Sequence, residues 1–162
     1  MLVYDYQMCV EPRPRTFAGL MQLAEDNYIL LRRLVPDISA LDCSVVSRAR
    51  GCLDLHLQIT GRWKFTSELI LTYWFRASQG IIHEPDLHIR IYHDARAAEA
   101  VCGILRHQRL IDIESSQTAL EEKWDLNRFL CKWLGYCLHR GHRFEPESRA
   151  DPRLERPSLL TP

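Results

Sequence analysis

Residues 52–75 restrict the fold more than any other part of the chain, because they contain two strand-forming segments separated by a short turn. In CLDLHLQIT (52–60), leucine and isoleucine alternate with other residues, and this period of two is typical of a strand with one buried face. The turn TGRWK leads into FTSELILTYWF (65–75), which is apolar on both faces and rich in β-branched and aromatic residues, as in a central strand. Two such strands joined by a short turn pair antiparallel.

Three further segments are predicted to extend this sheet. Residues 43–46 predict an earlier strand, residues 87–92 predict a fourth, and residues 104–113 predict a last one. The residues that alternate with leucine and isoleucine in these strands would share one polar face. We expect this face to be solvated, and the alternative is that it binds a ligand or a partner; its members are Asp54, His56, Gln58, His88 and Arg90.

Helices are predicted before and after these strands. Residues 16–34 carry apolar residues three and four positions apart, with Thr16 as the N-cap and Pro36 as the residue that closes the element. Residues 121–141 form a second amphipathic helix that ends at Gly141, a common residue after a helix C-terminus. The first apolar stripe consists of Phe17, Leu20, Met21, Ala24, Tyr28 and Leu31, and the second consists of Leu126, Leu130, Trp133, Leu134, Cys137 and Leu138.

A short alanine-rich helix is predicted after the fourth strand. Strand 87–92 runs directly into ARAAEAVCGIL, and alanine has the highest intrinsic helix propensity. Asp94 would cap this helix, because its carboxylate accepts hydrogen bonds from free backbone N–H groups and suits the positive end of the helix dipole. His93 would then immediately precede the cap.

This order of elements predicts an α+β fold in a single domain. An antiparallel sheet of about four to five strands would be covered on one face by the N-terminal and C-terminal helices. We expect an extended N-terminal arm at residues 1–15, the domain at residues 16–144, and a disordered, proline-rich tail at residues 145–162.

Composition narrows the class of partners. The chain has 21 basic and 21 acidic residues, so it lacks the basic excess that typical nucleic-acid-binding proteins show. No apolar run approaches the roughly 20 residues that a membrane span needs. The first residues, MLVYDYQMCVEPRPR, do not have the basic and then apolar regions of a secretory signal. We therefore expect a cytoplasmic protein that binds neither membranes nor nucleic acid.

No metal or cofactor is predicted. The six cysteines contain no CxxC pair, so we expect reduced and mostly buried thiols rather than a zinc site or a disulfide framework. His83, His88 and His93 recur every five residues, but an odd spacing on a strand directs neighbouring members to opposite faces. The seven glycines are scattered, and none of them forms a phosphate-binding loop.

The segment Tyr92-His93-Asp94 invites a catalytic interpretation, but its spacing argues against one. Successive residues of an extended chain point to opposite faces, so His93 and Asp94 do not easily form a histidine–carboxylate pair. The chain also has no GxSxG motif that would complete a catalytic triad. We prefer capping roles for both residues and keep His93 as an acid/base at a strand end as the alternative. Asn127, beside the apolar stripe of the last helix, needs a hydrogen-bond partner if it is buried.

The chain contains three sequence motifs. The first, NY-x2-L-x2-L-x-P, begins at Asn27, and the second, RIYHDARAAEAV, begins at Arg90 and matches the form VRLYHDA-x-x-AEV. The third, EEK-x3-N-x-FL-x2-WL-x2-CL-x2-G, runs from Glu121 to Gly141. Together these motifs resemble the YqiB-like proteins, a bacterial domain family of unknown function, over roughly residues 16–144. The chain departs from it at Glu121, where the family has Asp, and by lacking a Tyr-Pro pair before the last helix.

The resemblance implies no activity, because the family has none assigned. It does select polar residues that would gather into one cluster if the helices and the strand end meet. This candidate functional cluster consists of Glu25, Asn27, Arg90, Tyr92, His93, Asp94, Lys123 and Asn127.

Two functional hypotheses follow. The first is a small interaction or regulatory module without catalytic activity, which acts through a protein partner or as a homodimer. The second is a ligand-binding or hydrolytic domain for a small anionic or nucleotide-like molecule. In the second, Arg90 would bind the anion and His93 would act as acid/base together with Glu25 or Glu99.

Overall fold

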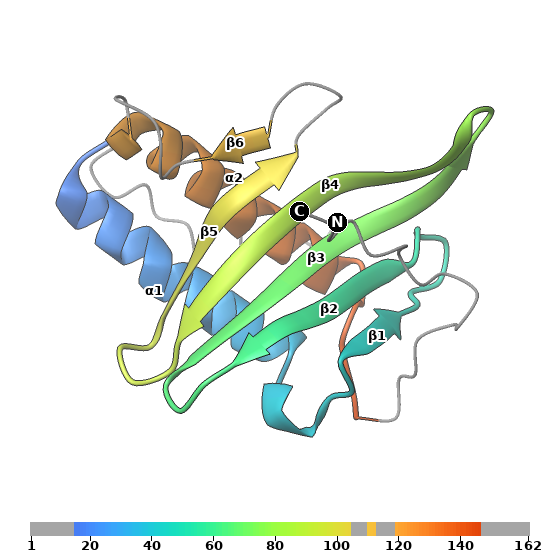
Figure 1. Cartoon of the computed structure of the whole chain (residues 1–162), viewed down its shortest axis with the longest axis horizontal. Helices are drawn as coiled ribbons and strands as arrows, with labels where there is room; N and C mark the ends of the chain where they lie inside the picture. The colour runs from blue at the N-terminus through green and yellow to red at the C-terminus, as the bar shows by residue number, and fades with distance from the viewer. Residues whose placement is uncertain (1–14, 105–109, 113–118, 147–162) are drawn as a thin grey trace, which may run out of the picture.

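The helices and strands form two layers, with both helices on one face of a single antiparallel sheet (Figure 1). The structure is a computed structural model that describes residues 15–104, 110–112 and 119–146. The six strands follow one another across the sheet in chain order, because each pairs with its predecessor as an antiparallel neighbour. The elements are α1 (Phe17–Leu34), the 3₁₀ helix η2 (Ile38–Ala40), β1 (Ser44–Ser47), β2 (Leu55–Arg62), β3 (Thr66–Ala77), β4 (Gly80–Tyr92), β5 (Ala97–Ile104), β6 (Leu110–Asp112) and α2 (Ala119–His139).

The predicted α+β class is confirmed, and so is the presence of the strands inferred from the apolar alternation, but β4 begins at Gly80 rather than at residue 87. The register aligns Leu57 of β2 with Leu71 of β3, and Leu71 with Leu87 of β4, so that one row of leucines crosses the sheet. All three are fully buried on the face that the helices cover. The last predicted strand, within 104–113, is present as the three-residue β6.

The alanine-rich segment is a strand, so the predicted helix after the fourth strand is wrong. Residues 93–96 form the turn of a hairpin, and β5 then pairs antiparallel with β4, with Tyr92 opposite Ala97. Asp94 is therefore not an N-cap but an exposed turn residue, and Arg96 completes the turn with φ 50°.

The physical reason is that the alanines are needed for packing rather than for helix propensity. Ala98 and Ala100 are 0% and 1% exposed, and β5 is the strand that both helices approach most closely. Larger side chains at these two positions would hold α1 and α2 away from the sheet. Tertiary packing therefore overrides the local preference of alanine.

Helix α1 begins as predicted but buries a different face. The Thr16 hydroxyl accepts a hydrogen bond from the Gly19 backbone N–H at 3.1 Å and so caps the helix. Phe17 and Met21 of the predicted stripe are 70% and 47% exposed. The helix packs against both the sheet and α2, and the side that meets both includes Leu23, Asn27, Leu30, Leu31 and Leu34.

Helix α2 ends where the sequence predicts. Gly141 has φ 88°, a left-handed conformation that glycine adopts without a steric penalty. The N–H of His142 donates to the carbonyl of Cys137 at 3.0 Å, and the N–H of Gly141 donates to that of Leu138 at 3.0 Å. This pair of hydrogen bonds is a Schellman motif.

Several predictions concern residues that the structure does not describe. The arm at 1–15 and the tail at 145–162 lie almost wholly outside the described residues. Of the described cysteines, Cys43, Cys52, Cys102 and Cys137 form no disulfide, but Cys131 is disulfide-bonded, so the expectation of reduced thiols is wrong there.

The described residues contain no helix that is both long and apolar enough to cross a membrane. Within the same residues, no group of three or more His, Cys, Asp or Glu side chains is placed to hold a metal ion.

A pair of glycine substitutions in α2 tests the C-terminal motif. Gly141→Ala forces an alanine into the left-handed region and should destabilise the protein by about 1–2 kcal/mol. Gly135→Ala, inside the helix, should stabilise it by up to about 1 kcal/mol, since alanine loses less backbone entropy there. A Cβ at either position has no atom within 4 Å, so neither change adds a clash. Chemical denaturation measures the free energy of unfolding of both variants. A change of the same sign in both would contradict the assignment of Gly141 as the left-handed residue that ends α2.

Candidate functional site

The eight residues of the predicted cluster do not lie in one place. Asn27, Lys123 and Asn127 lie where the two helices meet β5, and Arg90 and Tyr92 lie on the sheet face turned away from the helices. His93 lies at the first position of the β4–β5 turn, on the helix side. Glu25 and Asp94 are exposed.

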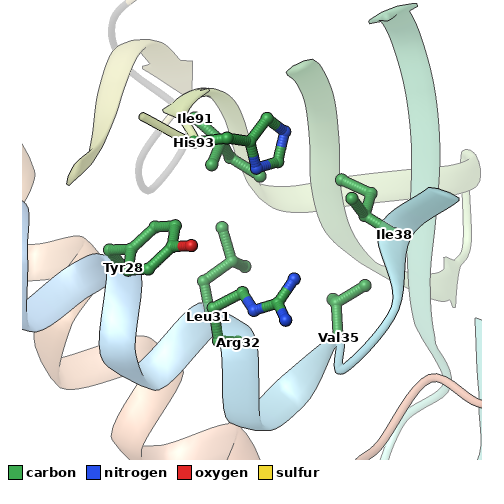
Figure 2. A pocket seen from close by; sticks show the side chains of 7 residues that line it. All are labelled: Tyr28, Leu31, Arg32, Val35, Ile38, Ile91 and His93. Atoms are coloured by element: carbon green, nitrogen blue, oxygen red, sulfur yellow. The ribbon is translucent and has the colours of Figure 1, made fainter. Parts of the chain in front are cut away.

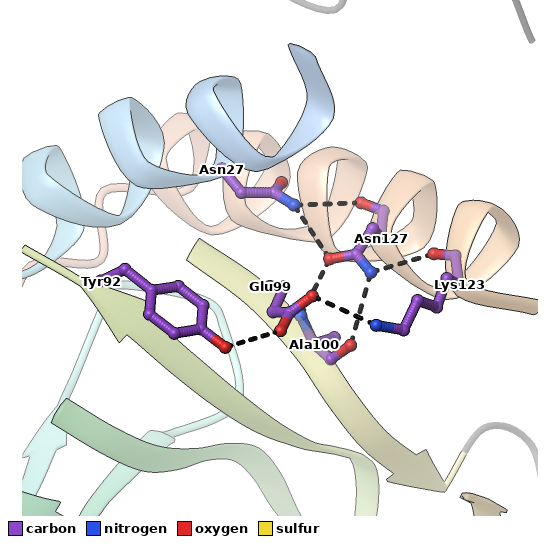
Figure 3. A network of polar contacts seen from close by, with 6 residues as sticks. All are labelled: Asn27, Tyr92, Glu99, Ala100, Lys123 and Asn127. Atoms are coloured by element: carbon purple, nitrogen blue, oxygen red, sulfur yellow. Dashed lines mark hydrogen bonds and ion pairs between the residues drawn. The ribbon is translucent and has the colours of Figure 1, made fainter. Parts of the chain in front are cut away.

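Asn127 joins α2 to the edge of β5 (Figure 3). Its Oδ1 accepts a hydrogen bond from the Ala100 N–H at 2.8 Å, and its Nδ2 donates to the Ala100 carbonyl at 3.4 Å and to the Lys123 carbonyl at 2.9 Å. Among the described residues, strand β6 pairs with Cys102–Ile104 alone and does not reach the backbone of Ala100. The side-chain amide of Asn127 therefore takes the place of a neighbouring strand at Ala100.

Asn27 extends this contact to α1. Its Nδ2 donates to the Oδ1 and to the backbone carbonyl of Asn127, both at 3.4 Å. Asn27 and Asn127 are 0% and 1% exposed. The Oδ1 of Asn27 is buried without a hydrogen-bond partner in the part of the chain that the structure describes. The sequence prediction that a buried Asn127 needs a structural hydrogen bond agrees with this geometry.

A chain of charged and hydroxyl groups crosses the opposite sheet face. The Arg90 Nε donates to the Glu68 Oε1 at 2.8 Å, and the Tyr92 hydroxyl donates to the Glu99 Oε1 at 2.9 Å. The Lys123 Nζ lies 3.8 Å from the Glu99 Oε2, which connects this chain to α2. The hydrogen bond to Glu68, and then one with Tyr92, raises the pKa of Arg90. Arg90 therefore already has a carboxylate partner and is poorly placed to bind an anionic ligand.

His93 is held by the neighbouring hairpin. Its N–H donates to the Phe65 carbonyl at 2.8 Å, and its Nε2 lies 2.8 Å from the Ser67 Oγ. Burial, and then the charge of Arg32, lowers the pKa of His93, while Asp94 opposes this shift. Ser67 pairs with the core-facing Ile91, so His93 faces the helices whereas Arg90 faces away from them. A site that uses Arg90 and His93 together has no shared space.

The distance between Ser67 and His93 suits a serine nucleophile and its base, but the surroundings do not. Ser67 is 4% exposed and does not line the neighbouring hollow, so a substrate has no path to its Oγ. The bond therefore serves to position the His93 ring.

A small hollow lies between α1 and the end of β4 (Figure 2). Its empty volume is about 210 Å³, which includes open solvent at its mouth. Sites for whole small molecules usually enclose roughly 300–1,000 Å³, whereas the space inside this hollow has room for about one water molecule, so it is a shallow depression and not a ligand cavity. Its lining consists of Tyr28, Leu31, Arg32, Val35, Ile38, Ile91 and His93.

Sequence reasoning missed a buried histidine on the sheet. His56, expected on a solvated polar face, is 6% exposed and stacks on Trp74 with ring centroids 4.0 Å apart. The His83 and Trp74 rings also meet in a T-shaped arrangement, with their centroids 4.7 Å apart. Burial lowers the pKa of His56 to about 4, with Asp54 opposing the shift and Arg48 and His83 adding to it. Alternation gives the side of a strand on which a residue lies but not whether that side is covered.

Sequence reasoning also passed over the β2–β3 turn, where two aromatic residues are exposed. Trp63 and Phe65 are 59% and 50% exposed, and the Lys64 ammonium lies 4.9 Å from the Phe65 ring centroid. The Trp63 ring covers Gly61, where an added Cβ would lie 2.3 Å from the ring. The sequence did contain a signal for this exposure, because aromatic residues in a predicted turn have no strand or helix face on which to be buried.

The fold and these polar contacts define a single α+β domain, and comparison with known proteins places it in a family. A family model described as "Protein of unknown function (DUF1249)" matches residues 30–143. The chain is also 31% identical over 136 residues to "Uncharacterized protein YqiB" of Escherichia coli K12, covering 77% of this chain and 90% of that protein. The same values hold for YqiB from two other Escherichia coli strains.

The chain therefore belongs to the DUF1249 family and is similar to YqiB, and the resemblance seen in the sequence motifs is confirmed. No solved structure matches the chain at a significant level.

The contact between Asn127 and Ala100 is expected to dominate the stability of the helix–sheet junction. Asn127→Ala leaves the buried N–H of Ala100 without an acceptor and should cost about 2–3 kcal/mol. Asn27→Ala removes only the two longer contacts at 3.4 Å and should cost about 1 kcal/mol. Urea denaturation measures both, and equal losses would show that Asn127 has no special role.

His56 should make stability depend on pH. Its folded pKa of about 4 lies below the roughly 6.5 of an unfolded histidine, so the unfolded chain binds more protons between these values. Stability should fall by up to about 3 kcal/mol as the pH falls from about 6.5 to about 4.

His56→Phe should keep the stacking on Trp74 and lose the part of the pH dependence that His56 causes, whereas the parts from His93 and His142, whose pKa values burial also lowers, should remain. The free energy of unfolding at several pH values measures the effect, and an unchanged slope in His56→Phe would refute the assignment.

Proposed function

We propose that the protein is a small interaction module that binds a protein partner through the end of the sheet where the β2–β3 and β4–β5 turns meet. We call this surface the sheet end and define it by Trp63, Lys64, Phe65, His93 and Arg96. A cytoplasmic location is part of the proposal and rests on expectation from the sequence. The observation that carries the proposal is the exposure of both Trp63 and Phe65 on one hairpin turn.

The two aromatic residues are unlike scattered surface hydrophobics. Single exposed apolar residues are common, but Trp63 and Phe65 lie two positions apart on a turn fixed by a backbone hydrogen bond from the Trp63 N–H to the Thr66 carbonyl at 2.8 Å. Contact with Gly61 also restricts the Trp63 ring. A large side chain that is already ordered loses little entropy on binding, which is why tryptophan is frequent among the residues that dominate interface energies.

The two turns form one surface because the backbone connects them. The His93 N–H donates to the Phe65 carbonyl, so the first residue of the β4–β5 turn lies against the last residue of the β2–β3 turn. Lys64 and Arg96 are exposed there, and Asp94 is the acidic residue of the β4–β5 turn. Aromatic and basic side chains together favour a partner with apolar and acidic groups.

The alternative function, an anionic-ligand or hydrolytic site built on Arg90 and His93, has less support. Arg90 is paired with Glu68, and His93 lies on the other side of the sheet. Neither residue lines a cavity with the other.

Site-specific photocrosslinking in bacterial cells tests the proposal. A photoreactive phenylalanine analogue at position 65 should give a discrete crosslinked protein, and the same analogue at position 17 should not, although Phe17 is 70% exposed. Trp63→Ser should reduce the crosslink from position 65 by about tenfold or more, since a central tryptophan typically contributes 2 kcal/mol or more.

Mass spectrometry then identifies the partner, and a product of two copies of this chain would show that the sheet end is a homodimer contact. Equal crosslinking from positions 17 and 65, or no effect of Trp63→Ser, would refute the sheet end as the binding surface. Circular dichroism of each variant confirms that its fold is intact.

A further inference from the structure

We propose that residues 157–162 of this chain, with the sequence PSLLTP, dock on the sheet face that is turned away from α1 and α2. The register places four residues of this face in one row across β1 to β4, and a fifth lies two positions further along β3. We call this surface the outer face, and its residues are Val46, His56, Thr72, Asp86 and Ile70. The proposal does not depend on the sheet end, because it concerns another surface and an occupant from the same chain.

The outer face is buried, although both helices lie on the opposite side of the sheet (Figure 1). Each of its five residues is at most 7% exposed. Val46 and Ile70 are among them, yet neither belongs to the hydrophobic core that the helices cover. An antiparallel sheet with one covered face normally exposes the other face to water, so the burial of this row indicates a second cover.

Two buried polar atoms on this face need a hydrogen-bond partner. The His56 Nε2 and the Trp74 Nε1 are buried, and neither has a partner in the part of the chain that the structure describes. The two rings stack with their centroids 4.0 Å apart, so both atoms lie in one aromatic patch. The indole N–H can only donate, and it therefore requires an acceptor such as a backbone carbonyl.

A segment that contains prolines supplies such acceptors. Pro157 and Pro162 have no backbone N–H, and proline favours an extended backbone whose carbonyls have no internal partner. Aromatic surfaces recognise extended, proline-containing segments in this way. Leu159 and Leu160, which lie between the two prolines, provide aliphatic side chains to pack against Val46 and Ile70.

The chain leaves α2 at the edge of the sheet that borders the outer face. The Arg143 N–H donates to the Ser47 Oγ at 3.0 Å, and the His142 Nδ1 lies 3.1 Å from the same oxygen. Ser47 lies on β1, the edge strand, next to Val46. Residues 147–162 can span roughly 50 Å when extended. The distance across the sheet from β1 to β4 is only about 15 Å, so this segment is long enough to pass around β1 and cross the outer face.

The distribution of charge selects residues 157–162 within that segment. All of its Asp, Glu and Arg residues lie in 147–156, and none lies in 157–162. Burial of a charged side chain costs much more than burial of leucine, threonine or proline. Residues 147–156 therefore connect α2 to the docked part, and the expectation of a disordered tail applies to them alone.

The other segments outside the described residues are less well placed to cover the outer face. Residues 105–109 and 113–118 are short connections that begin or end at β5, β6 or α2, so they do not extend across the sheet to β1. Residues 1–14 lead into α1 at Arg15, whose guanidinium lies 4.0 Å from the Asp125 carboxylate of α2. They therefore meet the described chain on the helix side.

Crosslinking within the full-length protein tests which segment covers the outer face. A photoreactive phenylalanine analogue replaces Gln58, an exposed residue that pairs with Ile70. Irradiation should join it to the tryptic peptide 154–162 in a product of monomeric mass; this peptide stays intact because trypsin does not cleave before Pro157. The same analogue at Tyr136, which is 43% exposed on α2, should not give this product.

The alternative outcomes of this experiment overturn the proposal. A crosslink from position 58 to residues 1–14 or 105–118 would assign the cover to another segment. A product of twice the mass would show that a second copy of the chain occupies the outer face. Absence of any crosslinked peptide would show that residues 157–162 are not docked there.

A charged substitution in the full-length chain provides a second test. Leu159→Lys should release the segment and raise the pKa of His56 from about 4 toward the roughly 6.5 of an exposed histidine, because burial is the main cause of the low pKa. If the segment stayed docked, the new positive charge would lower this pKa instead. The matched control Leu154→Lys adds the same charge outside 157–162 and should leave the pKa of His56 unchanged.

NMR titration of the His56 ring signals measures this pKa, and the Val46 and Ile70 methyl signals should shift in Leu159→Lys as well. An unchanged or lowered pKa in Leu159→Lys overturns the proposal. An equal rise in both variants also overturns it, because the effect would then not depend on residues 157–162.

Discussion

The structure depends on the hydrogen bonds between the Asn127 side chain and the backbone of Ala100. On the side away from β4, strand β5 pairs with the three-residue β6 alone among the described residues, so part of this edge has no strand partner there. An unpaired backbone group in a buried position costs about as much as a lost hydrogen bond, and the Asn127 amide supplies both a donor and an acceptor. Asn27 then ties α1 to the same point. One side chain thus fixes the positions of β5 and both helices.

This arrangement explains why alanine is found in a strand. The helices can place Asn27 and Asn127 against β5 only if the facing side chains of that strand are small, and Ala98 and Ala100 meet this requirement. The same alanines led to the prediction of a helix, because helix propensity depends on the local sequence alone. The close approach of α1 and α2 to β5 depends on tertiary packing and could not be read from that sequence. The sheet itself was predictable, since an alternation such as that of residues 55–59 follows from burial of one face.

The polar residues that the family motifs share divide into groups with different roles. Asn27 and Asn127 are structural, and Arg90, Tyr92 and Lys123 belong to a chain of paired charges that also contains Glu68 and Glu99. His93 alone lies beside the hollow. The sequence motifs could identify these residues as candidates. They could not show which of the residues lie together, because that depends on the face of the sheet that each one occupies. The exposed aromatic residues of the β2–β3 turn, rather than the motif residues, carry the proposed interaction.

The sequence by itself determined the α+β class, the order and approximate limits of most strands, the two long helices, the glycine at which α2 ends, and the family. These features follow from periodicity and from backbone preferences that act over a few residues. Only the tertiary structure decided the conformation of the alanine-rich segment, the buried face of α1, the burial of His56 on Trp74, and the placement of Arg90 and His93 on opposite sides of the sheet. Each of these depends on what a distant segment places against the residue, and that is a property of packing rather than of local sequence.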